Sequence, residues 1–151
     1  AIGVDLGSKR IGLSVCDSAG AVAVPLQTLE RSRKWAVDHA AISAAVSESA
    51  AEIVVVGMPL SMDGHEGPAA RRTLKELAVL RRTLTVPLET YDERLSTVQA
   101  EGSLRAASLS SSRRAEVIDE AAATVILQGW LDARSDATDG AGAEPRTEDR
   151  S

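Results

Sequence analysis

Three consecutive segments at the start of the chain alternate apolar and polar side chains with a period of two. Residues 1–6, 11–17 and 21–29 follow this pattern, which is typical of half-buried β-strands. The short sequences GSKR and DSAG between them have the composition of tight turns. The opening of the chain therefore predicts three strands joined as an antiparallel meander.

The rest of the chain changes period and predicts helices that alternate with strands. Residues 52–60 (EIVVVGMPL) are apolar on both faces, as expected for a central strand buried on both sides. The other predicted elements are a helix at 34–49, a helix at 69–84, a strand at 86–93, and helices at 95–107 and 113–134. Three antiparallel strands followed by two parallel ones, with helices on both faces, match an α/β fold of the RNase H-like architecture.

Length and composition limit the chain to one such domain. The 151 residues give room for a single core, which we expect over residues 1–134. Residues 135–151 contain no large aliphatic or aromatic residue and are predicted to be a disordered tail. The net charge of −5 argues against binding nucleic acid through bulk charge. The single Cys16 and the lack of a long apolar run favour a cytoplasmic protein that does not cross a membrane.

Three acidic residues occupy positions where a carboxylate is unusual. Asp5 lies inside an apolar strand, where burial disfavours its charge. Asp92 and Glu93 lie just past the VPLETY segment (residues 86–91), at the carboxyl end of the predicted strand, where ligands gather in parallel sheets. Asp119 shares a helical stripe with three apolar residues that should pack on the sheet: Ala123, Ile126 and Trp130.

Each of these acids also has a simple structural explanation. Asp5 could cap the turn that follows it, and Asp119 could complement the dipole of its helix. Glu93 fits a capping box that begins at Thr90. Taken together, however, three acids that converge on one point would need a divalent cation to offset their repulsion. Two such ions suit the hydrolysis of a phosphodiester bond.

Four sequence blocks add a resemblance to a known family. They are VDLGSKRIGLSV, VVVGMPLSMDGHEG, YDERLSTVQA and VIDEAAATVILQGWLD, and they cover most of the chain up to Arg134. In this order they resemble signature blocks of the YqgF/RuvX family, described both as Holliday-junction-resolvase-like proteins and as pre-16S rRNA nucleases. The resemblance implies an RNase H-like fold, a cytoplasmic location and nuclease activity with magnesium or manganese, two ions being expected. It places the acidic cluster, catalytic and metal-binding, at Asp5, Glu93 and Asp119.

Several functions are compatible with these features. We expect processing of the 5′ end of pre-16S rRNA first, and Holliday junction resolution by a homodimer as the alternative. A module that binds nucleic acid without cleaving it is a third reading. DLGSKRIGL also resembles the first phosphate loop of actin-like ATPases and sugar kinases, but the chain has room for one of their two lobes.

Basic residues near the acids are the candidates for binding nucleic acid through its phosphates. They are Lys9, Arg10, Arg71, Arg72, Arg94, Arg113 and Arg114. A solvated surface is the simpler explanation for each pair. Trp35 and Trp130 are predicted to lie in the core, so base stacking is not expected. His39 is predicted to be a core residue, and His65 a solvated loop residue or a proton shuttle.

Overall fold

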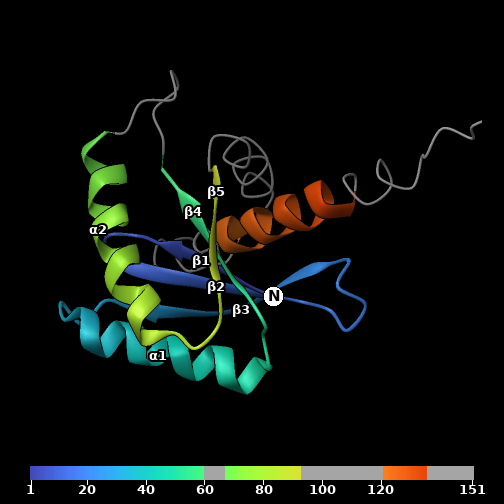
Figure 1. The fold of residues 1–151 in the computed structure, drawn as a ribbon, viewed down its shortest axis with the longest axis horizontal. Coiled ribbons are helices and arrows are strands. Elements are labelled where there is room, and N and C mark those ends of the chain that lie inside the picture. Colours follow the sequence, from blue (N-terminus) through green and yellow to red (C-terminus); the bar gives the residue numbers. More distant parts are fainter. Residues whose placement is uncertain (60–66, 93–120, 136–151) are drawn as a thin grey trace, which may run out of the picture.

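The structure, a computed structural model, describes residues 1–59, 67–92 and 121–135. Five strands form one sheet in the order β3-β2-β1-β4-β5 (Figure 1). Their bounds are β1 (Ile2–Leu6), β2 (Arg10–Cys16), β3 (Ala23–Glu30), β4 (Val54–Met58) and β5 (Leu88–Asp92). The predicted helices at 95–107 and at the start of 113–134, and the predicted tail beyond Ser135, lie outside the described residues.

The pairing of the strands confirms the predicted mixed sheet. β1 pairs antiparallel with β2, and β2 antiparallel with β3, as expected for a meander. β4 lies parallel to β1 on one side and to β5 on the other. All five residues of β4 are buried, as the apolar run at 52–60 predicted for a central strand.

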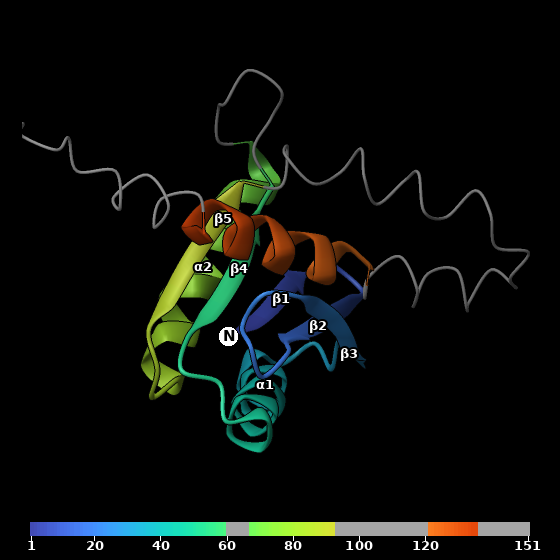
Figure 2. The ribbon, with the colours of Figure 1, turned by 90° about the vertical axis from the view of Figure 1, so that its right-hand side faces the viewer.

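Helices cover both faces of the sheet, which also agrees with the prediction. Helices α1 (Trp35–Ser49) and α2 (Pro68–Thr83) lie on one face, and the helix of residues 121–135 lies on the other (Figures 1 and 2). Pro68 begins α2, where its missing N–H costs no hydrogen bond. No helix among the described residues is long and apolar enough to cross a membrane.

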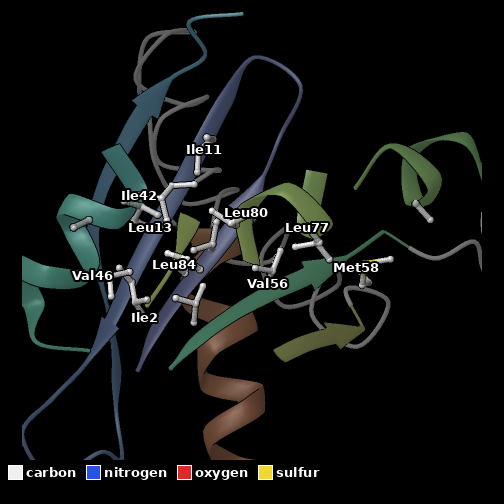
Figure 3. Packing of buried hydrophobic residues seen from close by; sticks show 14 residues of the cluster. Ile2, Ile11, Leu13, Ile42, Val46, Val56, Met58, Leu77, Leu80 and Leu84 are labelled. Atoms are coloured by element: carbon white, nitrogen blue, oxygen red, sulfur yellow. The ribbon is translucent and has the colours of Figure 1, made fainter. Parts of the chain in front are cut away.

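Each face of the sheet has its own apolar core. The larger one lies between the sheet and helices α1 and α2 and is built from aliphatic side chains (Figure 3). The smaller one lies under the helix of residues 121–135 and contains Ile126, Leu127 and Trp130. The stripe predicted to pack on the sheet, formed by Ala123, Ile126 and Trp130, is buried at all three positions.

The second helix layer approaches the sheet closely. The hydroxyl of Ser14 donates a hydrogen bond to the carbonyl oxygen of Ala123 at 2.7 Å, and Ser14 is fully buried. A Cβ atom on Gly3 would lie 2.8 Å from the same oxygen and 2.8 Å from Cβ of Leu127. Glycine at this position therefore allows the helix of residues 121–135 to lie directly on β1.

The prediction that Trp35 belongs to the core is wrong. Its side chain is 40% exposed, although the next members of the stripe, His39, Ile42 and Val46, are buried. Trp35 is the first residue of α1 and lines a cavity that opens at the end of β1 and beside α2, so one side of its ring stays open. The helical stripe predicted the buried face of α1 but not that its first residue opens onto a cavity.

Candidate active site at the carboxyl end of the sheet

The three parallel strands end at the same side of the sheet. Val4 of β1 pairs with Val56 of β4, and Met58 of β4 pairs with Asp92 of β5. Asp5 is the residue after Val4 and thus lies level with the last residues of β4. We call this side of the sheet its carboxyl end, and it is where ligands bind in open sheets with parallel strands.

Asp5 is half-buried within a strand whose first three residues are fully enclosed. Side chains alternate along a strand, so Asp5 points to the same face as Gly3, which is covered by the helix of residues 121–135. This is the placement that the sequence predicted for Asp5. Glu93 and Asp119, the other predicted metal ligands, lie outside the described residues.

A cavity of about 700 Å³ opens beside Asp5, and we call it the carboxyl-end cavity. The loop after β1, the segment after β3, and the first turns of α1 and α2 contribute to its wall. Its charged and aromatic lining residues are Asp5, Arg31, Arg33, Trp35, Asp38, Arg72, Lys75 and Glu76. The cavity brings together segments that are far apart in the sequence, from residue 5 to residue 76.

A buried ion-pair network forms one wall of this cavity. Two guanidinium nitrogens of Arg31, Nη1 and Nη2, donate to the two carboxylate oxygens of Glu76 at 2.5 and 2.9 Å. Nη1 also lies 3.4 Å from Oδ2 of Asp38. Glu76 and Asp38 are 5% and 4% exposed, so their charges depend on Arg31 for compensation.

His39 completes the network from the core side. Its Nε2 lies 2.9 Å from Oε1 of Glu76, and its side chain is fully buried. The ionised carboxylate of Glu76 can only accept, so Nε2 carries the proton and donates. Nδ1 has no hydrogen-bond partner among the described residues. The prediction of a core histidine is confirmed, but its partner Glu76 was not foreseen.

The network also sets the ionisation of Asp38. Burial on its own would raise the pKa of this carboxyl group, but hydrogen bonds from Ser32 and Arg31 outweigh burial and hold the pKa below its usual range. The backbone N–H of Ser32 donates to Oδ1 of Asp38 at 3.0 Å. Asp38 is therefore charged at neutral pH and holds the segment after β3 against α1.

The predicted phosphate-binding residues divide between the described and the undescribed parts of the chain. Lys9, Arg71 and Arg72 are exposed, and Arg72 lines the carboxyl-end cavity. Arg10 is half-buried as the first residue of β2. Outside the described residues lie Arg94, Arg113, Arg114 and also His65. Within residues 1–59, 67–92 and 121–135, no three His, Cys, Asp or Glu side chains gather as metal ligands.

Tyr91 lies at the same end of the sheet, on the face that carries Asp5. A Cβ on Gly129 would collide with its hydroxyl, so the tyrosine ring rests directly on the helix of residues 121–135. Burial raises the pKa of Tyr91, and the negative charges of Asp132 and Asp92 raise it further. The phenol therefore stays protonated at neutral pH.

The fold described here is shared with solved nucleases of DNA junctions. RuvC of Thermus thermophilus, in complex with a Holliday junction substrate, matches with a TM-score of 0.54 and 17% identity, covering 89% of this chain and 94% of that chain. The Holliday junction resolvase of fowlpox virus matches with a TM-score of 0.50 and 9% identity, covering 88% and 97%. The chain thus has the RNase H-like fold of these resolvases.

The sequence comparisons define the family. A family model described as "RuvX: Holliday junction resolvase" matches residues 1–133, and the chain belongs to this family. A relative from Myxococcus xanthus, "Putative pre-16S rRNA nuclease", is 48% identical over 132 residues, covering 87% of each chain. A relative of the same name from Kineococcus radiotolerans is 46% identical over 133 residues, covering 87% of this chain and 71% of the relative.

Proposed function

We propose that the chain is a nuclease that hydrolyses phosphodiester bonds in structured RNA and processes the 5′ end of pre-16S rRNA. The position of Asp5 carries this proposal. Its carboxylate lies on the central strand pair, where three parallel strands end, beside a cavity lined with cations. The names of the relatives, which match over most of the chain, support the substrate.

The proposed metal site consists of Asp5, Glu93 and Asp119, with magnesium or manganese as the ion. Asp5 fits this role because oxygen ligands suit both ions and because the carboxylate is half-buried rather than fully enclosed. Glu93 directly follows Asp92, the last residue of β5, and Asp119 precedes the sheet-packed Ala123 by four positions. Two ions bound there would activate a water molecule and stabilise the leaving oxygen.

The remaining predicted residues would bind and orient the substrate through its phosphates. Lys9 lies in the loop between β1 and β2, Arg10 is the first residue of β2, and Arg72 lines the carboxyl-end cavity. In the proposed complex, Arg71, Arg94, Arg113 and Arg114 extend this set of phosphate contacts. Arginine suits this task because its planar group can bind two phosphate oxygens at once.

The nuclease domain is proposed to comprise residues 1–134 and to act in the cytoplasm. The family match over residues 1–133 supports this boundary. The second candidate function is the resolution of Holliday junctions, which the description of the family model favours. That reaction needs two active sites to cut two strands together, and it would therefore require a homodimer.

The test is cleavage with magnesium by the wild type and by Asp5→Asn, on a pre-16S rRNA 5′ leader and on a four-way DNA junction. We expect the substitution to lower the cleavage rate at least about a hundredfold, because it removes a metal ligand charge. Chelation of the metal should have the same effect. Asp17→Asn is the matched control, since Asp17 is exposed at the opposite end of the sheet.

Each outcome has a defined meaning. If Asp5→Asn cleaves as fast as the wild type, the proposed active site is wrong. Faster cleavage of the RNA leader than of the junction supports rRNA processing. If a dimer cuts the junction symmetrically and leaves the RNA intact, the function is Holliday junction resolution instead.

A further inference from the structure

Trp35 is a large aromatic side chain that the fold leaves open to solvent. It is 40% exposed, although it is one of two tryptophans in a chain without phenylalanine. Its ring stacks on the buried ring of His39, with 6.1 Å between centroids and 21° between planes. An indole supported from below and exposed at a cavity is a suitable platform for stacking a nucleobase.

Three cations line the carboxyl-end cavity together with Trp35. Arg33, Arg72 and Lys75 are all exposed, and within the described part of the chain none of them pairs with a carboxylate. Arg31, in the same wall, is different because Glu76 and Asp38 hold it. Among the described residues, no carboxylate neutralises the charge of these three side chains, which favours an anionic ligand.

The backbone at Arg33 supports a functional role. Its φ angle of 69° lies in the left-handed region, which is unfavourable for a residue that carries a Cβ. Strained residues of this kind are retained mainly where they position a side chain for function. Here the conformation occurs between Arg31, which is anchored in the network, and Trp35, which begins α1.

The cavity has the size and position to hold part of a substrate strand. Its volume of about 700 Å³ falls within the range of roughly 300–1,000 Å³ found for small-molecule sites. Asp5 lines it from the end of β1 and Trp35 lines it from the first turn of α1, on the other face of the sheet. A strand that crosses the carboxyl end of the sheet past Asp5 can therefore place a neighbouring nucleotide at Trp35. A paired base cannot stack on a side chain in this way, because its faces are occupied by the adjacent base pairs.

We propose that the carboxyl-end cavity binds an unpaired nucleotide next to the scissile phosphate, with its base stacked on Trp35 and its phosphate held by Arg33 and Lys75. The inference rests on the proposed nuclease function and narrows its substrate class. The preferred substrate has a single-stranded segment beside the cleavage site. A continuous duplex leaves the cavity unfilled.

Binding can be tested without cleavage, by fluorescence anisotropy in the presence of a chelator. The probe is a short fluorescein-labelled single-stranded RNA, compared with the same strand annealed to its complement and with a DNA strand of the same sequence. We expect Trp35→Ala to weaken single-strand binding by about fivefold to a hundredfold, which corresponds to the loss of one stacked base. Duplex binding should change little.

Matched variants separate stacking from loss of structure. Trp35→Phe keeps an aromatic ring over His39 and should retain most of the affinity. Val37→Ala, on α1 and 54% exposed but outside the cavity wall, should bind like the wild type. Thermal unfolding of each variant shows that it is folded.

The cations have a control of the same kind. Lys75→Ala should reduce the slope of log affinity against log salt by about 0.7, which is the value of one phosphate contact on a single strand. Arg82→Ala, also exposed on α2 but outside the cavity wall, should leave the slope unchanged. If a cavity variant loses the same affinity for the RNA strand as for the DNA strand, the cavity binds single strands of either kind. If it loses more affinity for the RNA strand, the cavity also contacts the ribose.

The result that overturns the inference is specific to it. If folded Trp35→Ala binds the single strand as tightly as the wild type, or loses affinity equally for the duplex, no base stacks on Trp35. This outcome leaves the Asp5→Asn cleavage test unaffected. Conversely, an active Asp5→Asn variant would refute the proposed active site while the binding measurement could still succeed.

Discussion

Each end of the sheet has one tryptophan beside it, and the fold buries one of the two side chains and leaves the other partly exposed. At the amino end, Trp130 is only 8% exposed, and its Nε1 donates to Oε2 of Glu89 at 2.7 Å. The guanidinium of Arg134 lies 4.5 Å from the centre of its ring. At the carboxyl end, Trp35 is 40% exposed and stacks on His39.

This difference shows how a small domain separates stability from function. Trp130 has both a hydrogen-bond acceptor and a neighbouring cation within the protein, so its ring needs no external ligand. Around Trp35, the described cations Arg33 and Lys75 lack such partners, and Asp5 lies close by. The carboxyl end is therefore the end prepared for a charged, aromatic ligand, while the network of Arg31 keeps its wall in place.

The largest stability effect is expected at the carboxyl end, from the loss of Glu76. Glu76→Ala leaves Arg31 and His39 without their shared acceptor. Breaking such a buried pair should lower the free energy of unfolding by about 3 kcal/mol. Urea denaturation measures this value. Glu48→Ala, which removes an exposed glutamate from the last turn of α1, should change it by less than about 0.5 kcal/mol. Equal effects would show that the network does not support this end.

A smaller effect at the same end depends on pH. The pKa of Asp38 is lower in the folded than in the unfolded protein, so the ionised group stabilises the fold at pH values above its unfolded pKa. This contribution disappears as the pH falls through the folded pKa. We expect Asp38→Asn to cost about 1.5 kcal/mol at pH 7. The difference from the wild type should shrink below about pH 4. A difference that is unchanged at pH 3 would contradict the assignment.

The smallest effect is expected at the amino end. Arg134 is exposed, so Arg134→Ala should lower the free energy of unfolding by only about 0.5 kcal/mol through the lost contact with the Trp130 ring. Trp130 fluorescence during urea denaturation, in a Trp35→Phe background, provides the measurement. If Arg134→Ala lowered the free energy of unfolding as much as Glu76→Ala, the two ends of the sheet would not differ in how much their charged side chains stabilise the fold.

Most of the fold could be predicted because its strands carry local patterns. The alternation in residues 1–29 and the apolar run at 52–60 reflect which faces of each strand are buried. This information lies in residues that are adjacent in the sequence, so it can be read without knowing the fold. The position of Asp5 followed for the same reason, since a carboxylate breaks an apolar strand visibly. The placement of Glu93 and Asp119 stays a prediction.

The carboxyl-end cavity could not be predicted because it depends on distant segments. Arg31 and Glu76 are 45 positions apart, and no local pattern pairs them. One signal was present: Glu76 lies on the buried face of α2 between Thr73 and Leu80, a position where a charge needs a partner. The exposure of Trp35 could not be predicted because a helical stripe does not show that the first turn of α1 borders a cavity made by distant segments.

Amide hydrogen exchange of the whole chain, with and without a saturating short single-stranded RNA in a chelating buffer, tests most directly whether the carboxyl end binds the substrate. We predict slower exchange in residues 31–38 and 67–76, around the carboxyl-end cavity, and unchanged exchange in residues 126–135 and 50–54 at the amino end. Protection confined to the amino end, with residues 31–38 unaffected, would contradict the account.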